Sequence, residues 1–161
     1  MDTTAFFNYP TLGSGRDAAP APAPSGAPDP GFLPHASMDE WDAVLAATET
    51  LRFHPGDLVL RAGERDRAFY VLLDGRLEVA GNGAEIAAPS AFGVGAFLDD
   101  APRAVTLRAR TDGEAARMSW EAYEALAARD PRLGRAILVD LGRGLAARLR
   151  IAGAALPEWT G

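Results

Sequence analysis

Residues 53–79 read FHPGDLVLRAGERDRAFYVLLDGRLEV, and this stretch decides the fold. It holds two short apolar runs, at 58–60 and 69–73, and a stretch at 76–79 in which Leu77 and Val79 alternate with polar residues, with turn sequences such as Asp74-Gly75 between them. Short apolar runs bounded by Gly, Pro and Asp are typical of β-strands, whereas helices need about 10 residues or more. The stretch therefore predicts three strands joined by tight turns.

The strand pattern continues beyond this stretch. Gly81-Asn82-Gly83 is a hairpin turn signal. Val105, Leu107 and Ala109 alternate with polar residues, as in a half-buried strand. Short strands that recur about every 8–12 residues indicate a β-sandwich or barrel.

Helices are expected on both sides of the strands. Ser37 and Glu40 fit a capping box, and the helix that they begin is expected to end near Leu51. Ser119 is expected to cap a second helix, and Asp130-Pro131 begins a long third one. The predicted fold class is therefore mainly β with flanking α-helices.

The long helix has two different faces. One face could cover the β-core, pair with a second chain in a homodimer, or do both at different points along its length. Its apolar stripe consists of residues spaced by four: Leu133, Ile137, Leu141, Leu145 and Leu149. The other face is expected to be solvated and carries Arg132, Arg135, Arg143 and Arg148.

Residues 1–36 are expected to form a disordered leader. The leader is rich in proline, and the stretch 18–31 is largely alternating Ala-Pro, which favours an extended chain. The folded domain is expected over residues 37–152, with a short tail at 153–161.

A small aromatic cluster stands out at residues 5–9 of this leader. It consists of Phe6, Phe7 and Tyr9. Aromatic side chains are uncommon in plain disordered linkers. The cluster is either incidental or a peptide that binds a protein partner.

Three motifs resemble one known family. Phe53, Gly56, Asp57, Val59, Leu60 and Gly63 match its opening pattern, and Phe69, Tyr70, Val71, Leu72, Gly75, Leu77 and Val79 match its second block. Residues 92–107, FGVGAFLDDAPRAVTL, are similar to its phosphate-binding cassette. The family is the cyclic-nucleotide-binding domain, the effector domain of the catabolite activator (Crp-Fnr) proteins and of kinase regulatory subunits.

The resemblance covers about residues 37–151. It implies a double-stranded β-helix, or jelly roll, with an N-terminal helix and two C-terminal helices. It also implies a phosphate cassette for cyclic AMP or a related nucleotide, made of Phe92, Gly93, Val94, Gly95, Ala96, Arg103 and Ala104. In that family the glycine turn lets backbone amides approach the phosphate, and the arginine binds its oxygens.

The cassette also departs from the family pattern. Val94 stands where the family has a ribose-binding Glu, and Ala104 replaces a Ser or Thr. Residues 131–151 contain no hydroxyl side chain that could contact the base. Because each lost hydrogen bond costs about 1–3 kcal/mol, the sequence predicts a degenerate nucleotide pocket.

Arg103 has two interpretations. It could contact a phosphate-bearing ligand. Alternatively, it could form an ion pair with Asp99 or Asp100, which would fill the phosphate position with the protein's own carboxylate.

Composition restricts the function classes. The net charge of −6 argues against direct contact with nucleic acid, and no helix-turn-helix follows the long helix. There is no cysteine, no apolar run long enough for a membrane span, and no His arrangement with metal-ligand spacing. We expect a cytoplasmic protein that is not an enzyme and holds no metal.

Two functions fit these features. The first is a protein-interaction or assembly module with a degenerate pocket, tethered through its N-terminal peptide. The alternative is a regulatory sensor that binds cyclic AMP or a related phosphate-containing ligand and signals to a separate partner.

Overall fold

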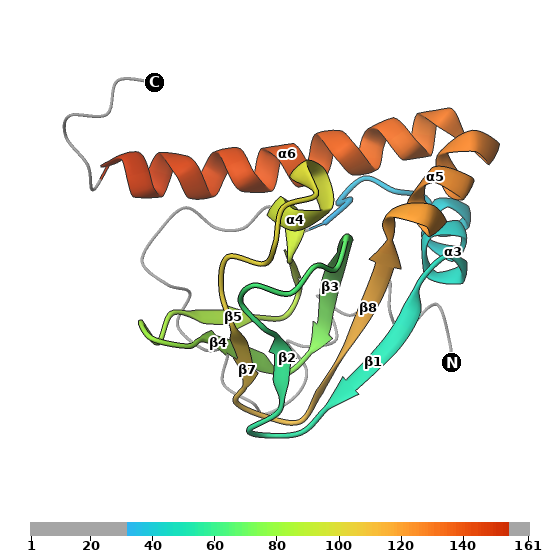
Figure 1. Cartoon of the computed structure of the whole chain (residues 1–161). Coiled ribbons are helices and arrows are strands. Elements are labelled where there is room, and N and C mark those ends of the chain that lie inside the picture. The colour runs from blue at the N-terminus through green and yellow to red at the C-terminus, as the bar shows by residue number, and fades with distance from the viewer. Residues whose placement is uncertain (1–31, 155–161) are drawn as a thin grey trace.

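The computed structural model describes residues 32–154, with side chains described to residue 150 (Figure 1). The strands are β1 (Glu49–Phe53), β2 (Leu58–Leu60), β3 (Ala68–Asp74), β4 (Arg76–Val79), β5 (Glu85–Ala87), β6 (Ser90–Phe92), β7 (Leu107–Ala109) and β8 (Gly113–Ser119). The helices are α3 (Met38–Ala46), α4 (Val94–Asp99), α5 (Trp120–Arg129) and α6 (Pro131–Ala154).

The strands form two antiparallel sheets of four strands each. One sheet has the order β1-β8-β3-β6 and the other β2-β7-β4-β5. Neighbours within a sheet are mostly distant in sequence, as in a jelly roll. The jelly-roll prediction is therefore confirmed.

The position of strand β3 between two cores explains why its sequence is apolar almost throughout. Tyr70 and Leu72 lie in the core between the sheets, which also holds Phe53 and Leu107. The alternate residues, such as Phe69, lie in a second core beneath the helices. Because both faces of β3 are covered, the strand shows a continuous apolar run instead of alternation.

The three predicted helix starts are confirmed by their caps. The backbone N–H of Glu40 donates to Ser37 Oγ at 3.1 Å, and that of Ala122 donates to Ser119 Oγ. The N–H of Leu133 donates to Asp130 Oδ1 at 3.1 Å. In Figure 1, α6 runs along the top of the molecule over α4, and its last turns extend past that helix.

The N-terminal boundary of the packed region differs from the prediction. Phe32 and Leu33 are buried in the core beneath the helices, and the N–H of Leu33 donates to Asp140 Oδ2 at 2.7 Å. Residues 32–36 therefore belong with the domain rather than with a leader. The burial of two large apolar side chains outweighs the proline-rich composition around them.

Two element predictions are wrong. Helix α3 ends at Ala46 instead of near Leu51, because residues 49–53 form β1 and pair with β8. The last expected strand begins at Leu107, and Val105 lies outside it with 43% of its surface exposed. In both places the boundary is set by pairing with a distant strand. Local periodicity in the sequence does not predict such pairing.

Candidate functional site

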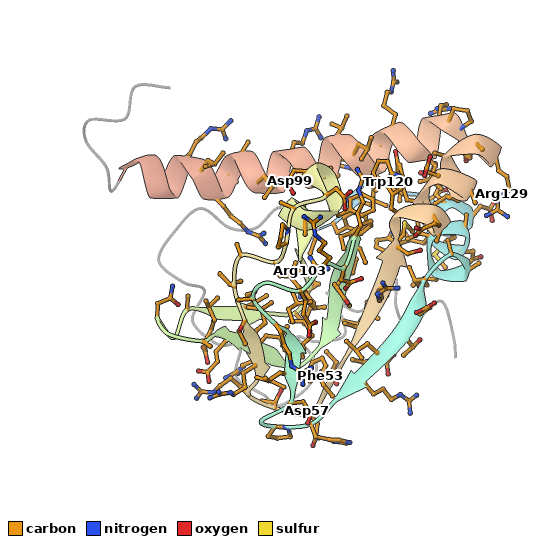
Figure 2. All side chains as sticks on the ribbon, viewed as in Figure 1. Phe53, Asp57, Asp99, Arg103, Trp120 and Arg129 are labelled. Carbon is orange, nitrogen blue, oxygen red and sulfur yellow. The ribbon has the colours of Figure 1, made fainter. Side chains whose placement is uncertain are left out.

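The cassette runs from the end of β6 through α4 to the loop that leads into β7. Phe92 ends β6 and stacks on Tyr70, with ring centroids 4.9 Å apart. Gly93 follows with φ +70°, in the left-handed region that favours glycine. The loop after α4 then returns Arg103 to this turn, below α4 in Figure 2.

Gly93 and Arg103 are fitted closely to each other. Arg103 Nη1 donates to the carbonyl oxygen of Gly93 at 2.7 Å. A Cβ at position 93 would lie 2.8 Å from the same Nη1 atom. Glycine is therefore required here both by the backbone conformation and by the approach of the guanidinium.

Arg103 is buried, at 5% exposure, and is held from several sides. Its backbone N–H donates to the Glu64 carbonyl, and its own carbonyl accepts from the Gly63 N–H, both at 2.8 Å. Its Nη2 donates to the Ala68 carbonyl at 2.8 Å and to Asp66 Oδ2 at 3.1 Å. These contacts fix the guanidinium in one place.

One donor of Arg103 has no acceptor. The Nε atom is buried, and no described residue accepts a hydrogen bond from it. An unsatisfied buried N–H of a charged group costs at least about 1–3 kcal/mol. The site thus holds a buried, positioned cation with one donor that no described residue satisfies.

Asp66 is the carboxylate partner of Arg103. It also accepts a hydrogen bond from the Tyr70 hydroxyl at 2.8 Å and one from Arg117 Nη2 at 2.5 Å. Burial by itself would raise the pKa of Asp66, but hydrogen bonds from Arg117, Tyr70 and Arg103 outweigh it and hold that pKa below its usual value. Asp66 therefore stays ionised at neutral pH.

The prediction that Arg103 pairs with Asp99 or Asp100 is wrong, because its carboxylate partner is Asp66. Asp99 Oδ1 accepts from the backbone N–H of Ala101 instead. The Asp100 carbonyl accepts from Arg65. Sequence proximity suggested these two residues, but the pairing carboxylate comes from the loop before β3.

The Val94 side of the cassette has different surroundings. Val94 is 4% exposed and belongs to the apolar core beneath the helices. With Phe32, Leu141 and Leu145 it lines a small cavity of about 20 Å³ between the cassette and α6. Position 94 thus supplies packing, with no acceptor for a ribose hydroxyl.

The other cassette residues are placed as follows. Ala96 is buried on α4, whereas Gly95 and Ala104 are exposed. Within the cassette, the residues that could contact a phosphate are Arg103, a buried cation, and Gly93 beside it. They do not fit a ribose through position 94.

The apolar stripe of α6 is divided between two environments. Leu133, Ile137 and Leu141 are buried in this chain's own core, so this part of the stripe follows the alternative in which the helix covers the core and does not pair with a second chain. Leu145 packs partly against the same core. Leu149 is 55% exposed, so only the distal part of the stripe is available to a second copy.

Several predictions remain outside these observations. The described residues do not include the aromatic cluster Phe6, Phe7 and Tyr9. They also do not include the tail beyond the end of α6 at residue 154. Among residues 32–154, none of the helices is apolar enough over a sufficient length to cross a bilayer. The same part of the chain contains no cluster of three or more His, Asp or Glu side chains that could hold a metal ion.

Comparison with known proteins agrees with this geometry. Residues 50–130 match the family model of the cyclic nucleotide-binding domain. A cAMP-dependent protein kinase regulatory subunit from Emericella nidulans is 33% identical over 88 residues, which are 52% of this chain and 21% of the relative. A second one, from Colletotrichum orbiculare, is 32% identical over 92 residues, 54% of this chain and 24% of the relative. The chain thus spans less than a quarter of the length of either relative.

Solved structures show the same fold. A cyclic nucleotide-binding domain from Methylobacillus flagellatus superposes with a TM-score of 0.69 at 24% identity, covering 78% of this chain and 76% of that one. The catabolite activator protein of Thermus thermophilus gives 0.64 at 24% identity, covering 76% and 60%.

Proposed function

Because this chain belongs to the cyclic nucleotide-binding domain family, we propose that its cassette is a regulatory site for a phosphate-bearing ligand, with cyclic AMP as the first candidate. Arg103 would bind the phosphate. The observation that carries the proposal is the buried, fixed guanidinium whose Nε has no acceptor among the described residues. A purely structural arginine would normally have this donor satisfied.

The charge balance around Arg103 supports the same function. Asp66 faces two guanidinium groups, those of Arg103 and Arg117. Glu49 also pairs with Arg117, but its side chain is largely exposed and screened by water. Asp66 is therefore shared between two guanidinium groups, and an anion next to Gly93 would gain a charge-assisted hydrogen bond from Arg103.

The affinity for a cyclic nucleotide is expected to be reduced. Position 94 offers no hydrogen bond to a ribose hydroxyl, which costs about 1–3 kcal/mol, or about 5- to 150-fold in affinity. Asp66 also competes with a ligand for Arg103. We therefore propose weak binding in which phosphate recognition dominates over sugar recognition.

Helix α6 is the element that would report ligand binding. It packs against Val94 through the apolar core, and Arg148 Nη2 donates to the carbonyl oxygen of Ala91 at 2.8 Å. Ala91 lies in β6, immediately before the cassette. A ligand that shifts Gly93 and α4 would thereby change the preferred position of α6.

Calorimetric titration tests this proposal. The full chain is titrated with cyclic AMP, cyclic GMP and adenosine, and the series is repeated with Arg103→Lys. We expect weak saturable binding of the cyclic nucleotides, none of adenosine, and a clear loss of affinity in the variant. Equal binding of adenosine and cyclic AMP would overturn phosphate recognition. Absence of heat and of a thermal shift at millimolar cyclic AMP would also overturn it.

A second candidate function is assembly with a protein partner. It is favoured by the exposure of Leu149 on the distal part of α6 and, in the sequence, by the aromatic peptide Phe6, Phe7 and Tyr9. In this role the domain would be non-catalytic and tethered through its N-terminal peptide. Pull-downs with and without residues 1–17 test the tether, and unchanged interactions after deletion would remove it.

Homodimerisation would use the same distal part of α6. Sedimentation of the full chain over a range of concentrations is the appropriate measurement. Leu149→Ser should weaken self-association without changing the melting temperature, because the side chain is exposed. A strict monomer at high concentration would contradict this proposal.

A further inference from the structure

An open groove runs along α6 on the side of residues 33–36. Its volume is about 320 Å³. Leu33 and Ala36 lie on one side, and Ala136 and Val139 lie on the other. Val139 is 46% exposed although it is a large apolar residue in the middle of α6. Leu33 is buried, and Ala36 and Ala136 pack against the core beneath the helices, so Val139 supplies the exposed apolar surface of the groove.

Three arginines of α6 also line this groove: Arg132, Arg135 and Arg143. All three are exposed. None of them forms an ion pair or a hydrogen bond with another residue in the described part of the chain. Other exposed arginines, such as Arg52 and Arg110, do have carboxylate partners. The groove is thus a concentration of unpaired positive charge.

Two carboxylates also line the groove and form no ion pair with these arginines in the described part of the chain, so the three arginines leave the lining a net charge of +1. Asp140 Oδ2 accepts the backbone N–H of Leu33 at 2.7 Å. Glu40 is the other carboxylate that lines the groove. As a whole, α6 carries five arginines and one aspartate, in a chain whose net charge is −6. The positive charge of α6 is therefore a local exception to an acidic protein.

We propose that this groove binds an acidic peptide segment of a partner protein. An aliphatic side chain of the peptide would lie on Val139, with carboxylates on Arg132 and Arg143 on either side. These two arginines are about 17 Å apart along the helix axis, since an α-helix rises about 1.5 Å per residue. An extended peptide covers that distance in about five residues. Cations spread over this length suit a row of carboxylates better than one small anion.

The experiment uses fluorescence anisotropy with two labelled synthetic peptides. One contains Asp, Glu, Leu and Ser, and the other has Lys in place of every acidic residue. The full chain should bind the acidic peptide and not the basic one. Binding should weaken as salt is added, because exposed charges are screened. Equal binding of both peptides, or no binding of the acidic one, would overturn the proposal.

Matched variants locate the binding surface. Arg143→Glu should weaken acidic-peptide binding about tenfold, a change of about 1.4 kcal/mol. Arg108→Glu makes the same charge change on an exposed residue of β7 and should have little effect. Equal loss in both variants would overturn the groove as the site. The melting temperatures of both should match the wild type, since both side chains are exposed.

Two further outcomes distinguish other ligands of the groove. Inorganic phosphate that displaces the peptide as effectively as an unlabelled acidic peptide would favour a small-anion site and contradict the proposal. Self-association that is lost in Arg143→Glu would favour a second copy of this chain and also contradict it. Cyclic AMP should bind Arg143→Glu and wild type equally, so failure at the cassette and failure at the groove can be told apart.

Discussion

The Arg103 side and the Val94 side of the cassette lie on the same short segment but are built from opposite chemistry. Arg103 is buried among carbonyl oxygens, a carboxylate and the ring of Tyr70, with one donor unpaired. Val94 is buried among apolar side chains beneath α6. Each residue is nearly inaccessible to water, so the difference lies in polarity and not in burial.

This difference indicates that the two sides of a ligand site can accept substitutions to different degrees. A buried arginine must keep its partners, because an uncompensated buried charge is costly. A position that contacts a sugar edge can be converted to packing at the cost of ligand affinity alone. In the site that we propose, the phosphate-binding half is tied to the fold through Arg103, whereas the sugar-contacting position can change independently of it.

The largest expected effect comes from removing the guanidinium on the polar side. Arg103→Ala leaves the carbonyls of Gly93 and Ala68 without their donor. We expect a loss of about 3–5 kcal/mol in the free energy of unfolding, as for other broken buried ion pairs. Urea denaturation measures it, with Arg108→Ala as the control. A loss equal to that of the control would mean that Arg103 is not needed by the fold.

The next effect comes from the apolar side. Val94→Ala should cost about 2 kcal/mol, because it removes two buried methyl groups and leaves a cavity next to α6. Nucleotide affinity should change little, since position 94 makes no polar contact. A marked fall in cyclic AMP affinity, measured on the folded variant, would show that the two sides are not independent.

The smallest of these effects concerns Asp66. Its pKa is held low in the folded state, so its stabilising contribution is present above the unfolded pKa of about 3.9 and is lost as pH falls through the folded pKa. Asp66→Asn should lose about 1 kcal/mol at neutral pH, since hydrogen bonds to a charged acceptor weaken and the side chain is 26% exposed to water. The free energy of unfolding of Asp66→Asn should also fall less steeply with decreasing pH than that of the wild type.

The same variant tests the competition between carboxylate and ligand. Without the negative charge of Asp66, Arg103 should bind a phosphate-bearing ligand several-fold more tightly. Calorimetry with cyclic AMP on Asp66→Asn and on wild type gives the comparison. Unchanged or weaker binding would indicate that Asp66 positions Arg103 instead of competing for it.

The sequence predicted the parts of this site that are local. The Phe92-Gly93 turn, the position of Arg103 and the caps at Ser37, Ser119 and Asp130 follow from residues close together in the chain. Local sequence fails to predict where the first helix ends, because residues near Leu51 belong to β1, which forms only by pairing with β8.

The partner of Arg103 could not be predicted in the same way. Asp66 lies 37 residues earlier, and only the closure of the jelly roll brings it to the cassette. The burial of Phe32 and Leu33 was also missed, since the neighbouring prolines indicate an extended linker. Both cases depend on tertiary contacts that overrule local composition.

The most direct test of the central claim observes the unpaired donor of Arg103 itself. Its Nε–H signal can be assigned in a ¹⁵N-resolved NMR spectrum of the full chain by comparison with Arg103→Lys. On titration with cyclic AMP, we expect this signal to shift saturably, while adenosine leaves it in place. A signal that does not move at millimolar cyclic AMP would contradict a phosphate site at Arg103.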